Sequence, residues 1–268
     1  MNIGIIGYGS IGSLLVQKFA DAGVTAPKNI FISNRSKEKL EGLRDTYSVC
    51  ENNSECAANA DVLFICTGPY QIMEVYRDIL DDLKDDTLVV SLNEAISFEM
   101  IGYFLHHRTA KVIPSLTAEI NRSETLVSYN DLVTDKDKET LRSILSSIGN
   151  VYELPESELA IASDLVSSMP GFIAAIFDVF CKQAEKFSTM GKDQIIKMVL
   201  NSLDASSTLI NQKGLTFNEV VDRVATPGGI TVEGTTVIYD KLPDIVDEIY
   251  EKTLEKSKTT KRKVITDC

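Results

Sequence analysis

Three glycines near the start of the chain have the spacing of a backbone turn that binds phosphate groups. The apolar run Ile3 to Ile6 leads into a G-x-G-x-x-G pattern, and an apolar helical pattern follows it. In such a strand-turn-helix unit the first glycine permits a tight turn, the second lets the backbone approach a pyrophosphate, and the third allows the helix to pack on the strand. The helix N-terminus adds free N–H groups and a positive dipole end. We predict a dinucleotide site that comprises Gly7, Tyr8, Gly9, Ser10, Ile11 and Gly12. The alternative is that the glycines only allow the strand and the helix to pack closely, without binding a ligand.

The end of the second predicted strand indicates which dinucleotide binds. The residues there, about 20 positions after the last glycine, are Ser33, Asn34, Arg35 and Ser36. NAD-binding chains usually place an acid here for the ribose 2′-hydroxyl, but this chain has none before Glu38. Arg35 can instead form charge-assisted hydrogen bonds to a 2′-phosphate, with Ser33 or Ser36 adding a hydroxyl. The sequence therefore predicts that NADP(H) is preferred over NAD(H). The alternative is a polar turn that caps the next helix.

Loops after other strands supply further candidates, because ligands of an open parallel sheet lie beyond the carboxyl ends of its strands. The additional cofactor residues that we predict are Thr67, Gly68, Pro69, Ser91 and Pro114. A separate segment, residues 226–231, is a glycine turn that runs into a predicted helix near Val232. Its backbone N–H groups suit a carboxylate, and Thr231 adds a hydroxyl. Thr231 could equally be an ordinary helix cap.

These residues are carried by two regions with different patterns. Up to about residue 150, strand-like runs alternate with helical patterns, which is typical of a parallel sheet covered on both faces. The predicted strands are residues 2–6, 29–33, 47–50, 61–66, 87–92, 110–114 and 125–129. The predicted helices are residues 10–22, 37–45, 70–80, 97–107 and 136–148, followed by 156–167, 170–186, 192–211, 217–224 and 243–258. We predict an α/β fold, with a Rossmann-type NADP-binding domain at 1–152 and an all-helical dimerisation domain at 153–268.

Several boundaries within this pattern are also predicted. Gly149 and Asn150 resemble a helix stop, and residues 167–170 resemble a helix start, with serine near the cap and proline in the first turn. The apolar faces of the later helices exceed what a unit of that size can bury, so we expect a homodimer. The basic tail at 256–263 is expected to be frayed and solvated.

Composition restricts the class of protein. A chain of 268 residues with a formal charge of −12 suits two folded domains and argues against partners such as nucleic acid or an anionic membrane. Five cysteines without metal spacing favour reduced thiols in the cytoplasm. The only histidines, His106 and His107, are adjacent and expected at an exposed helix end, so no metal site is predicted. The longest apolar run, Met169 to Phe180, is interrupted by Asp178 and is too short to span a bilayer.

Taken together, five segments resemble the pyrroline-5-carboxylate reductase family, over nearly the whole chain. They are residues 3–12, Asn34 to Ser36, Ile113 to Ser115 near the family's M-P-N-T-P, Ser167 to Pro170 near its S-G-S-G-P, and Thr226 to Thr231 against its S-P-G-G-x-T, the most specific of the five. The resemblance implies reduction of the cyclic imine Δ1-pyrroline-5-carboxylate to L-proline by NAD(P)H, in proline biosynthesis. It also implies an active site where the dinucleotide domain of one subunit meets the helical domain of its partner.

The resemblance implies roles for particular residues. Thr231 would be the catalytic hydroxyl that bonds the ring nitrogen, and the backbone from Gly228 through Gly229 and Ile230 to Thr231 would hold the substrate carboxylate. Ser168 would also contact the substrate, while Ser91 and Pro114 would form walls of the nicotinamide pocket.

The chain departs from the family pattern at three places. Gly68 stands where the family usually has lysine, Glu94 where it has the alanine of an Ala-Gly pair, and Ser115 where it has asparagine. The Ile-Pro-Ser, Ala162-Ser163-Asp164 and Gly-Gly-Ile-Thr variants look more like the late-competence, ComER-like branch. Two alternatives therefore stay open: an NADPH-dependent reductase of another imine or ketone, and a non-catalytic NADP-binding regulator. A carboxylate at Glu94 would repel an anionic substrate unless it points away.

Overall fold

The computed structural model describes residues 1–266 and divides the chain into two compact units. One unit contains Met1–Pro170 together with Thr253–Cys268, and the other contains Gly171–Lys252. The predicted boundary after residue 152 does not coincide with this division. The reason is that Leu159 and Ala162 pack with Ile113 and Leu126 of the sheet, so the first helical turns stay with the first unit.

One eight-stranded sheet forms the centre of the first unit. Its strands are β1 Ile3–Ile6, β2 Ile30–Ser33, β3 Ser48–Val49, β4 Val62–Ile65, β5 Leu88–Ser91, β6 Thr109–Ile113, β7 Ser123–Tyr129 and β8 Gly149–Glu153. They are ordered β3-β2-β1-β4-β5-β6-β7-β8, and every neighbouring pair is parallel except β6 and β7. The predicted parallel sheet is thus confirmed, with one antiparallel pair added.

Strand β8 was not predicted, because Gly149 and Asn150 were interpreted as a helix stop. They instead begin a strand that runs parallel to β7. A Cβ atom on Gly149 would lie 2.0 Å from the carbonyl oxygen of Ser123, so the glycine serves the close approach of two strands.

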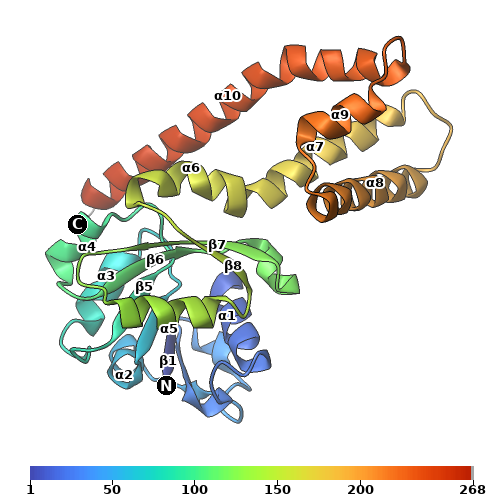
Figure 1. Ribbon diagram of the computed structural model, residues 1–268. Helices are drawn as coiled ribbons and strands as arrows, with labels where there is room; N and C mark the ends of the chain where they lie inside the picture. The colour runs from blue at the N-terminus through green and yellow to red at the C-terminus, as the bar shows by residue number, and fades with distance from the viewer. Residues whose placement is uncertain (267–268) are drawn as a thin grey trace. The chain divides into compact units, whose positions relative to one another are not determined.

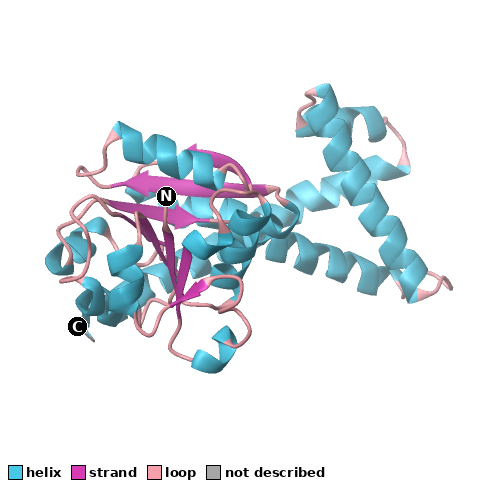
Figure 2. Ribbon diagram, turned by 90° about the horizontal axis from the view of Figure 1, so that it is seen from below, coloured by secondary structure: helices cyan, strands magenta, loops and turns pink. Residues whose placement is uncertain are grey.

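Helices cover both faces of the sheet (Figures 1 and 2). They are α1 Ser10–Asp21, α2 Asn53–Asn59, α3 Ile72–Ile79, α4 Phe98–Phe104 and α5 Asp135–Leu145. Successive strand residues point to opposite faces. Phe64 packs in the core that includes α1 and α5, whereas Leu63 and Ile65 pack in the core that includes α2, α3 and α4.

Two predicted helices of this unit need correction. The helix expected at 37–45 is only a 3₁₀ turn, Lys37–Leu40, followed by bends, and Gly42 has a positive φ of 78° that a helix cannot continue through. The helix expected at 97–107 ends at Phe104, so His106 and His107 lie in the following loop. Helix α2 was not predicted, since seven residues carry too little periodicity.

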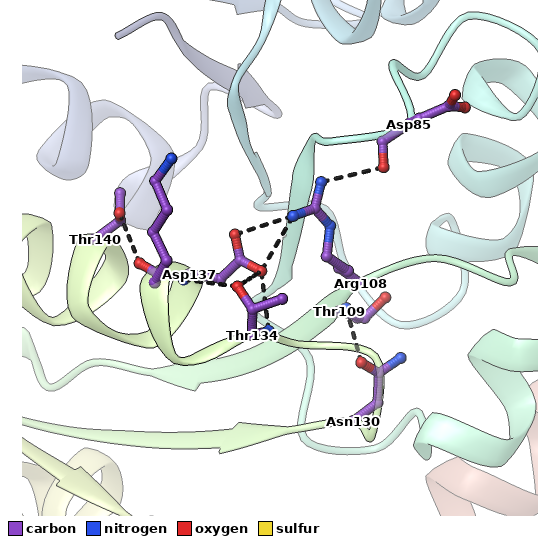
Figure 3. Close-up of polar contacts among 8 residues, drawn as sticks. Asp85, Arg108, Thr109, Asn130, Thr134, Asp137 and Thr140 are labelled. Atoms are coloured by element: carbon purple, nitrogen blue, oxygen red, sulfur yellow. Dashed lines mark hydrogen bonds and ion pairs between the residues drawn. The ribbon is translucent and has the colours of Figure 1, made fainter.

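Helix α5 begins at a capping box that is also an ion-pair site (Figure 3). Thr134 and Asp137 satisfy each other's backbone N–H groups, and Arg108 donates to both carboxylate oxygens of Asp137, at 3.3 and 3.2 Å. Arg108 also donates to the carbonyl oxygen of Asp85 at 3.1 Å. This contact fixes the start of α5 against the loops that precede β5 and β6.

The helical segment after the sheet is continuous through the predicted helix start at residues 167–170. It consists of α6 Leu159–Ser163, a π-helical turn Asp164–Ser168, and α7 Met169–Ala184. The wider π turn precedes Pro170, which has no N–H to donate and would crowd a regular α-helical turn. Among the described helices, the stretch Glu156–Ala184 is long and apolar enough to cross a bilayer by length and composition alone, and 17% of its apolar window is buried in this chain.

The second unit is helical (Figure 1). It contains most of α7, then α8 Lys192–Lys213, α9 Phe217–Val224 and the first part of α10 Ile230–Thr266. The bounds predicted for α9 are confirmed, and Thr216 and Glu219 form its capping box. The helices predicted near Val232 and at 243–258 form the single helix α10, and Pro243 lies inside it.

The expectation of a frayed tail at 256–263 is wrong. These residues are helical and belong to the first unit, where Val264 is 2% exposed. A basic composition alone could not indicate that one face of this helix contacts acidic and apolar partners.

Candidate active site

A cavity of about 460 Å³ lies at the carboxyl ends of β1, β2 and β4. The sheet order places β1 between β2 and β4, and this is the point of an open parallel sheet at which ligands bind. Eight predicted cofactor residues line the cavity: Gly7, Gly9, Ser33, Asn34, Arg35, Ser36, Thr67 and Gly68. Ser10, Ile11 and Gly12 form the first turn of α1 behind this lining, while Tyr8 and Pro69 lie on the two neighbouring loops.

The three glycines of the turn meet different surroundings. Gly7 has φ of +100°, and a Cβ atom there would lie 3.0 Å from the carbonyl group of Cys66. A Cβ atom on Gly12 would lie 1.9 Å from the carbonyl oxygen of Gly7, so any side chain would force the helix away from the turn. Gly9 has no atom within 4 Å of its added Cβ, so its backbone faces open space. This geometry agrees with a tight turn, a packed helix start and a surface free for phosphate.

Asn34 joins this turn to the end of β2. Its Oδ1 accepts a hydrogen bond from the backbone N–H of Tyr8 at 2.9 Å, and its Nδ2 donates to the carbonyl oxygen of Ser36 at 2.8 Å. Ser33 is buried, and its hydroxyl donates to Asn53 at 2.8 Å. The hydroxyl of Ser36 is therefore the better placed of the two predicted serine contacts.

Arg35 and Lys39 are cations of the cavity wall whose side chains are exposed and, within residues 1–266, make no hydrogen bond or ion pair. Lys37 also lines the cavity, but its Nζ donates to the carbonyl oxygens of Glu51 at 2.5 Å and Cys50 at 3.4 Å. An available guanidinium on the wall of this cavity fits a 2′-phosphate.

Sequence reasoning missed the wall that α2 and α3 contribute. Asn52 and Asn53 line the cavity with Gln71, Glu74 and Asp78. The sequence feature that could have indicated α2 is Asn52. Its side chain accepts a hydrogen bond from the N–H of Glu55 and so caps the helix. That signal is weak, because an asparagine before an acidic residue also occurs in turns.

Two buried hydroxyls lie beyond the glycine turn, along the direction from β1 to β5. The hydroxyl oxygen of Thr67 is buried and has no partner among residues 1–266, whereas the buried hydroxyl of Ser91 lies beside the hydroxyl of Tyr76. Parallel pairing places Ile65 of β4 opposite Ser91 of β5, and Pro114 is buried at the end of β6. A buried hydroxyl without a partner costs about 1–3 kcal/mol, so Thr67, which lines the cavity, fits a site that a polar ligand completes. It is consistent with a nicotinamide dinucleotide that extends from Arg35 across the glycine turn.

Glu94 is held in place by contacts at both its backbone and its side chain. Its carbonyl oxygen accepts from Lys111 Nζ at 2.9 Å, while its carboxylate accepts from Ser257 at 2.8 Å and pairs with Lys261 at 2.8 Å. Lys111, only 1% exposed, also pairs with Glu156 at 2.9 Å. Burial lowers the pKa of Lys111, and the Glu156 carboxylate counteracts this lowering only in part. The sequence-based concern about Glu94 is thus answered, because its charge faces a lysine.

Ser168, a predicted substrate residue, lies in the π-helical turn of the first unit. Its hydroxyl donates to Asp164 at 3.1 Å, and Thr253 donates to the other oxygen of the same carboxylate. Asp164 is 5% exposed. The Asp164 carboxylate therefore orients the Ser168 hydroxyl.

The segment Gly228–Thr231 belongs to the second unit. Gly228 has φ of +74°, the N–H of Gly229 donates to the carbonyl oxygen of Thr226 at 2.9 Å, and α10 begins at Ile230. Helix α10 thus starts two residues before the predicted position, and Thr231 lies inside its first turn. Within residues 1–266 the Thr231 hydroxyl makes no hydrogen bond, so it does not act as a cap.

Comparisons with known proteins agree with this arrangement. Residues 2–94 match the family described as NADP oxidoreductase coenzyme F420-dependent, and residues 156–260 match pyrroline-5-carboxylate reductase dimerisation. Pyrroline-5-carboxylate reductase 3 of Bacillus subtilis is 33% identical over 95% of this chain and 94% of its own length. ComE operon protein 4 of the same organism is 24% identical over 94% of each chain. A crystal structure of the Plasmodium falciparum pyrroline carboxylate reductase with NADP bound has the same fold, with a TM-score of 0.87, 20% identity and coverage of 97% of this chain and 98% of that one.

Proposed function

Because the chain belongs to the pyrroline-5-carboxylate reductase family, we propose that it reduces 1-pyrroline-5-carboxylate to L-proline with NADPH. The observation that carries the proposal is the single cavity that unites the glycine turn with the free guanidinium of Arg35. The buried hydroxyl of Thr67, which lines the same cavity and has no partner among residues 1–266, supports it further.

The preference for NADPH over NADH is supported by the chemistry at the end of β2. The chain offers Arg35 and the hydroxyl of Ser36 there, and no carboxylate precedes Glu38. A 2′-phosphate gains charge-assisted hydrogen bonds from these groups, whereas the segment directly after β2 offers no carboxylate to accept a hydrogen bond from a 2′-hydroxyl.

Sheet order gives the direction in which the cofactor extends. With the 2′-phosphate at β2 and the pyrophosphate at the turn after β1, the order β2-β1-β4-β5-β6 directs the nicotinamide toward the ends of β5 and β6. When bound, the nicotinamide supplies the hydride. The residues of the chain orient the reactants: Ser91 and Pro114 wall the nicotinamide end, and Asn34 and the glycine turn fix the other end.

The substrate-binding residues that we propose are Ser168 and the segment Gly228 to Thr231. The backbone N–H groups after Gly228 suit the substrate carboxylate, and the Thr231 hydroxyl is free to bond the ring nitrogen. Following the family, we propose that these groups of the helical part act on the cofactor of the partner subunit in a homodimer. The four described cysteines are free thiols, which supports a location in the reducing cytoplasm.

The role of Thr231 is tested by Thr231→Ala. If its hydroxyl bonds the ring nitrogen in the transition state, kcat/KM falls about 10- to 100-fold, equivalent to roughly 1.5–3 kcal/mol. The melting temperature should not change, because the hydroxyl makes no hydrogen bond within residues 1–266. A variant with unchanged kinetics would remove Thr231 from the mechanism.

The function itself is tested by following the absorbance of NADPH and NADH separately as purified protein is mixed with 1-pyrroline-5-carboxylate. Turnover with a higher kcat/KM for NADPH is expected. NADPH binding without turnover across a panel of cyclic imines would instead favour a regulator of the late-competence type.

A further inference from the structure

Glu94 lies in the loop that borders the nicotinamide end of the proposed cofactor path. It is the third residue after β5, and β5 pairs directly with β4, whose following loop lines the cofactor cavity. The N–H of Leu92 donates to the carbonyl oxygen of Ile65 at 3.1 Å, so the loop leaves β5 close to that cavity. A charge on this loop acts on whatever binds against the nicotinamide.

The charges around Glu94 cancel in pairs. Lys111 is paired with Glu156, and Glu94 is paired with Lys261, so the four groups sum to zero. Ser257 and Lys261 are four residues apart and therefore share one face of α10. Both hold the Glu94 carboxylate at 2.8 Å, and this side chain is only 17% exposed. Lys261 is thus the counter-charge of Glu94.

We propose that Lys261 is a specificity-determining residue, whose charge neutralises Glu94 and allows the site to accept a cyclic imine that carries a carboxylate. This inference rests on the proposed function. Without Lys261 the local charge becomes −1 beside the anionic substrate. If the separation is set at about 8 Å to give the scale, with an effective dielectric constant of about 20 to 40, a unit charge of the same sign weakens binding about 6- to 30-fold. A neutral imine would escape this repulsion.

The test compares 1-pyrroline-5-carboxylate with 1-pyrroline, which has the same ring without the carboxylate, at saturating NADPH. Lys261→Met should raise KM for the anionic imine about 6- to 30-fold and leave KM for the neutral imine and both kcat values near those of the parent. Lys261→Arg keeps the charge and should keep both KM values. Glu94→Gln combined with Lys261→Met removes both charges and should restore KM for the anionic imine.

Lys138→Met is the matched control. Lys138 pairs with Glu153 at 2.6 Å and is 34% exposed, against 36% for Lys261, but it lies on α5. Its loss should leave both KM values unchanged.

Two results would overturn the inference and distinguish it from the proposed function. Equal rises in KM for both imines, not reversed in the double variant, would show that Lys261 has only a structural role. A parent protein that oxidises NADPH with neither imine, and whose NADP⁺ complex binds no L-proline by calorimetry, would refute the proposed function and the inference with it.

Discussion

Gly9 and Gly12 lie three residues apart in one turn, yet replacing them should have opposite effects on folding and binding. Gly12→Ala places a methyl group against the carbonyl of Gly7 and should lower the free energy of unfolding by about 1–3 kcal/mol. Gly9→Ala meets open space and an extended backbone that alanine adopts, so stability should be kept. Its methyl group would occupy the pyrophosphate surface and weaken NADPH binding about 10-fold or more. Thermal unfolding and cofactor fluorescence titration check the two effects.

Arg35 should control which cofactor is bound. Arg35→Ala removes a charge-assisted hydrogen bond worth roughly 1.5–3 kcal/mol, so NADPH affinity should fall about 10- to 100-fold while NADH affinity stays constant. Calorimetric titrations with both cofactors measure this, and Arg122→Ala, an exposed arginine on a different loop, serves as the control. Equal losses for both cofactors would contradict the assignment.

Individual residues were predictable where local chain geometry sets their role. Gly7, Gly9 and Arg35 line the cavity because a turn and the strand after it fix their places, and their role in cofactor binding stays a prediction. The contact between Ser33 and Asn53, 20 residues apart, was not predictable, because it depends on how two segments meet in space. The same reason hides the pairing of Glu94 with Lys261.

The carboxyl group of Asp137, at the start of α5, should make a pH-dependent contribution to stability. Burial raises the pKa of Asp137, but the hydrogen bonds from Thr134 and the charge of Arg108 outweigh burial and lower it. A carboxyl whose folded-state pKa lies below its unfolded value of about 3.9 stabilises the fold at neutral pH, and this contribution is lost as the pH falls through the folded-state pKa.

Asp137→Asn should therefore lower the free energy of unfolding by about 1–2 kcal/mol at pH 7. The difference from the parent protein should shrink toward pH 3. Urea unfolding at both pH values measures it, with Asp135→Asn as the exposed control in the same helical turn. A difference that persists at pH 3 would show that the ion pair is not its source.

Elements were predicted best where a cap is encoded locally, as at Thr216 and Glu219 of α9. Proline misled the prediction twice. Pro170 follows a π turn inside a continuous helical segment, and Pro243 lies within α10, because the surrounding helix is retained despite the missing N–H. A proline in the sequence does not by itself show whether the helix stops there or continues through it.

At the scale of the molecule, the second unit has an apolar surface that a single chain leaves open. A cavity of about 360 Å³ between α7 and α8 is lined by Phe177, Phe180, Met198 and Leu203 among others, and Phe180 is 54% exposed. Exposed apolar patches of this kind mark subunit contacts. In the predicted homodimer the partner subunit would cover these apolar side chains. The apolar segment of α7 would then be buried by protein and not by a lipid bilayer.

Phe180→Asp should convert a dimer into a monomer, because a carboxylate cannot be buried unpaired at an apolar contact. Analytical ultracentrifugation measures the change, and Tyr103→Asp, at an exposed aromatic residue of the first unit, should remain dimeric. A parent protein that sediments as a monomer would refute the dimer.

Residues 253–266 complete the first unit, although residues 171–252 separate them from the rest of it. A ribosome must therefore synthesise the whole second unit before Thr253, which completes the contacts of Asp164, and both partners of the Glu94 carboxylate exist. The sheet can assemble early, but Lys261, the counter-charge of Glu94, arrives late. Neutralisation of Glu94 is thus among the last events in the biogenesis of the protein, and a nascent chain interrupted before residue 253 would leave Glu94 without Ser257 and Lys261, and Asp164 with Ser168 but without Thr253.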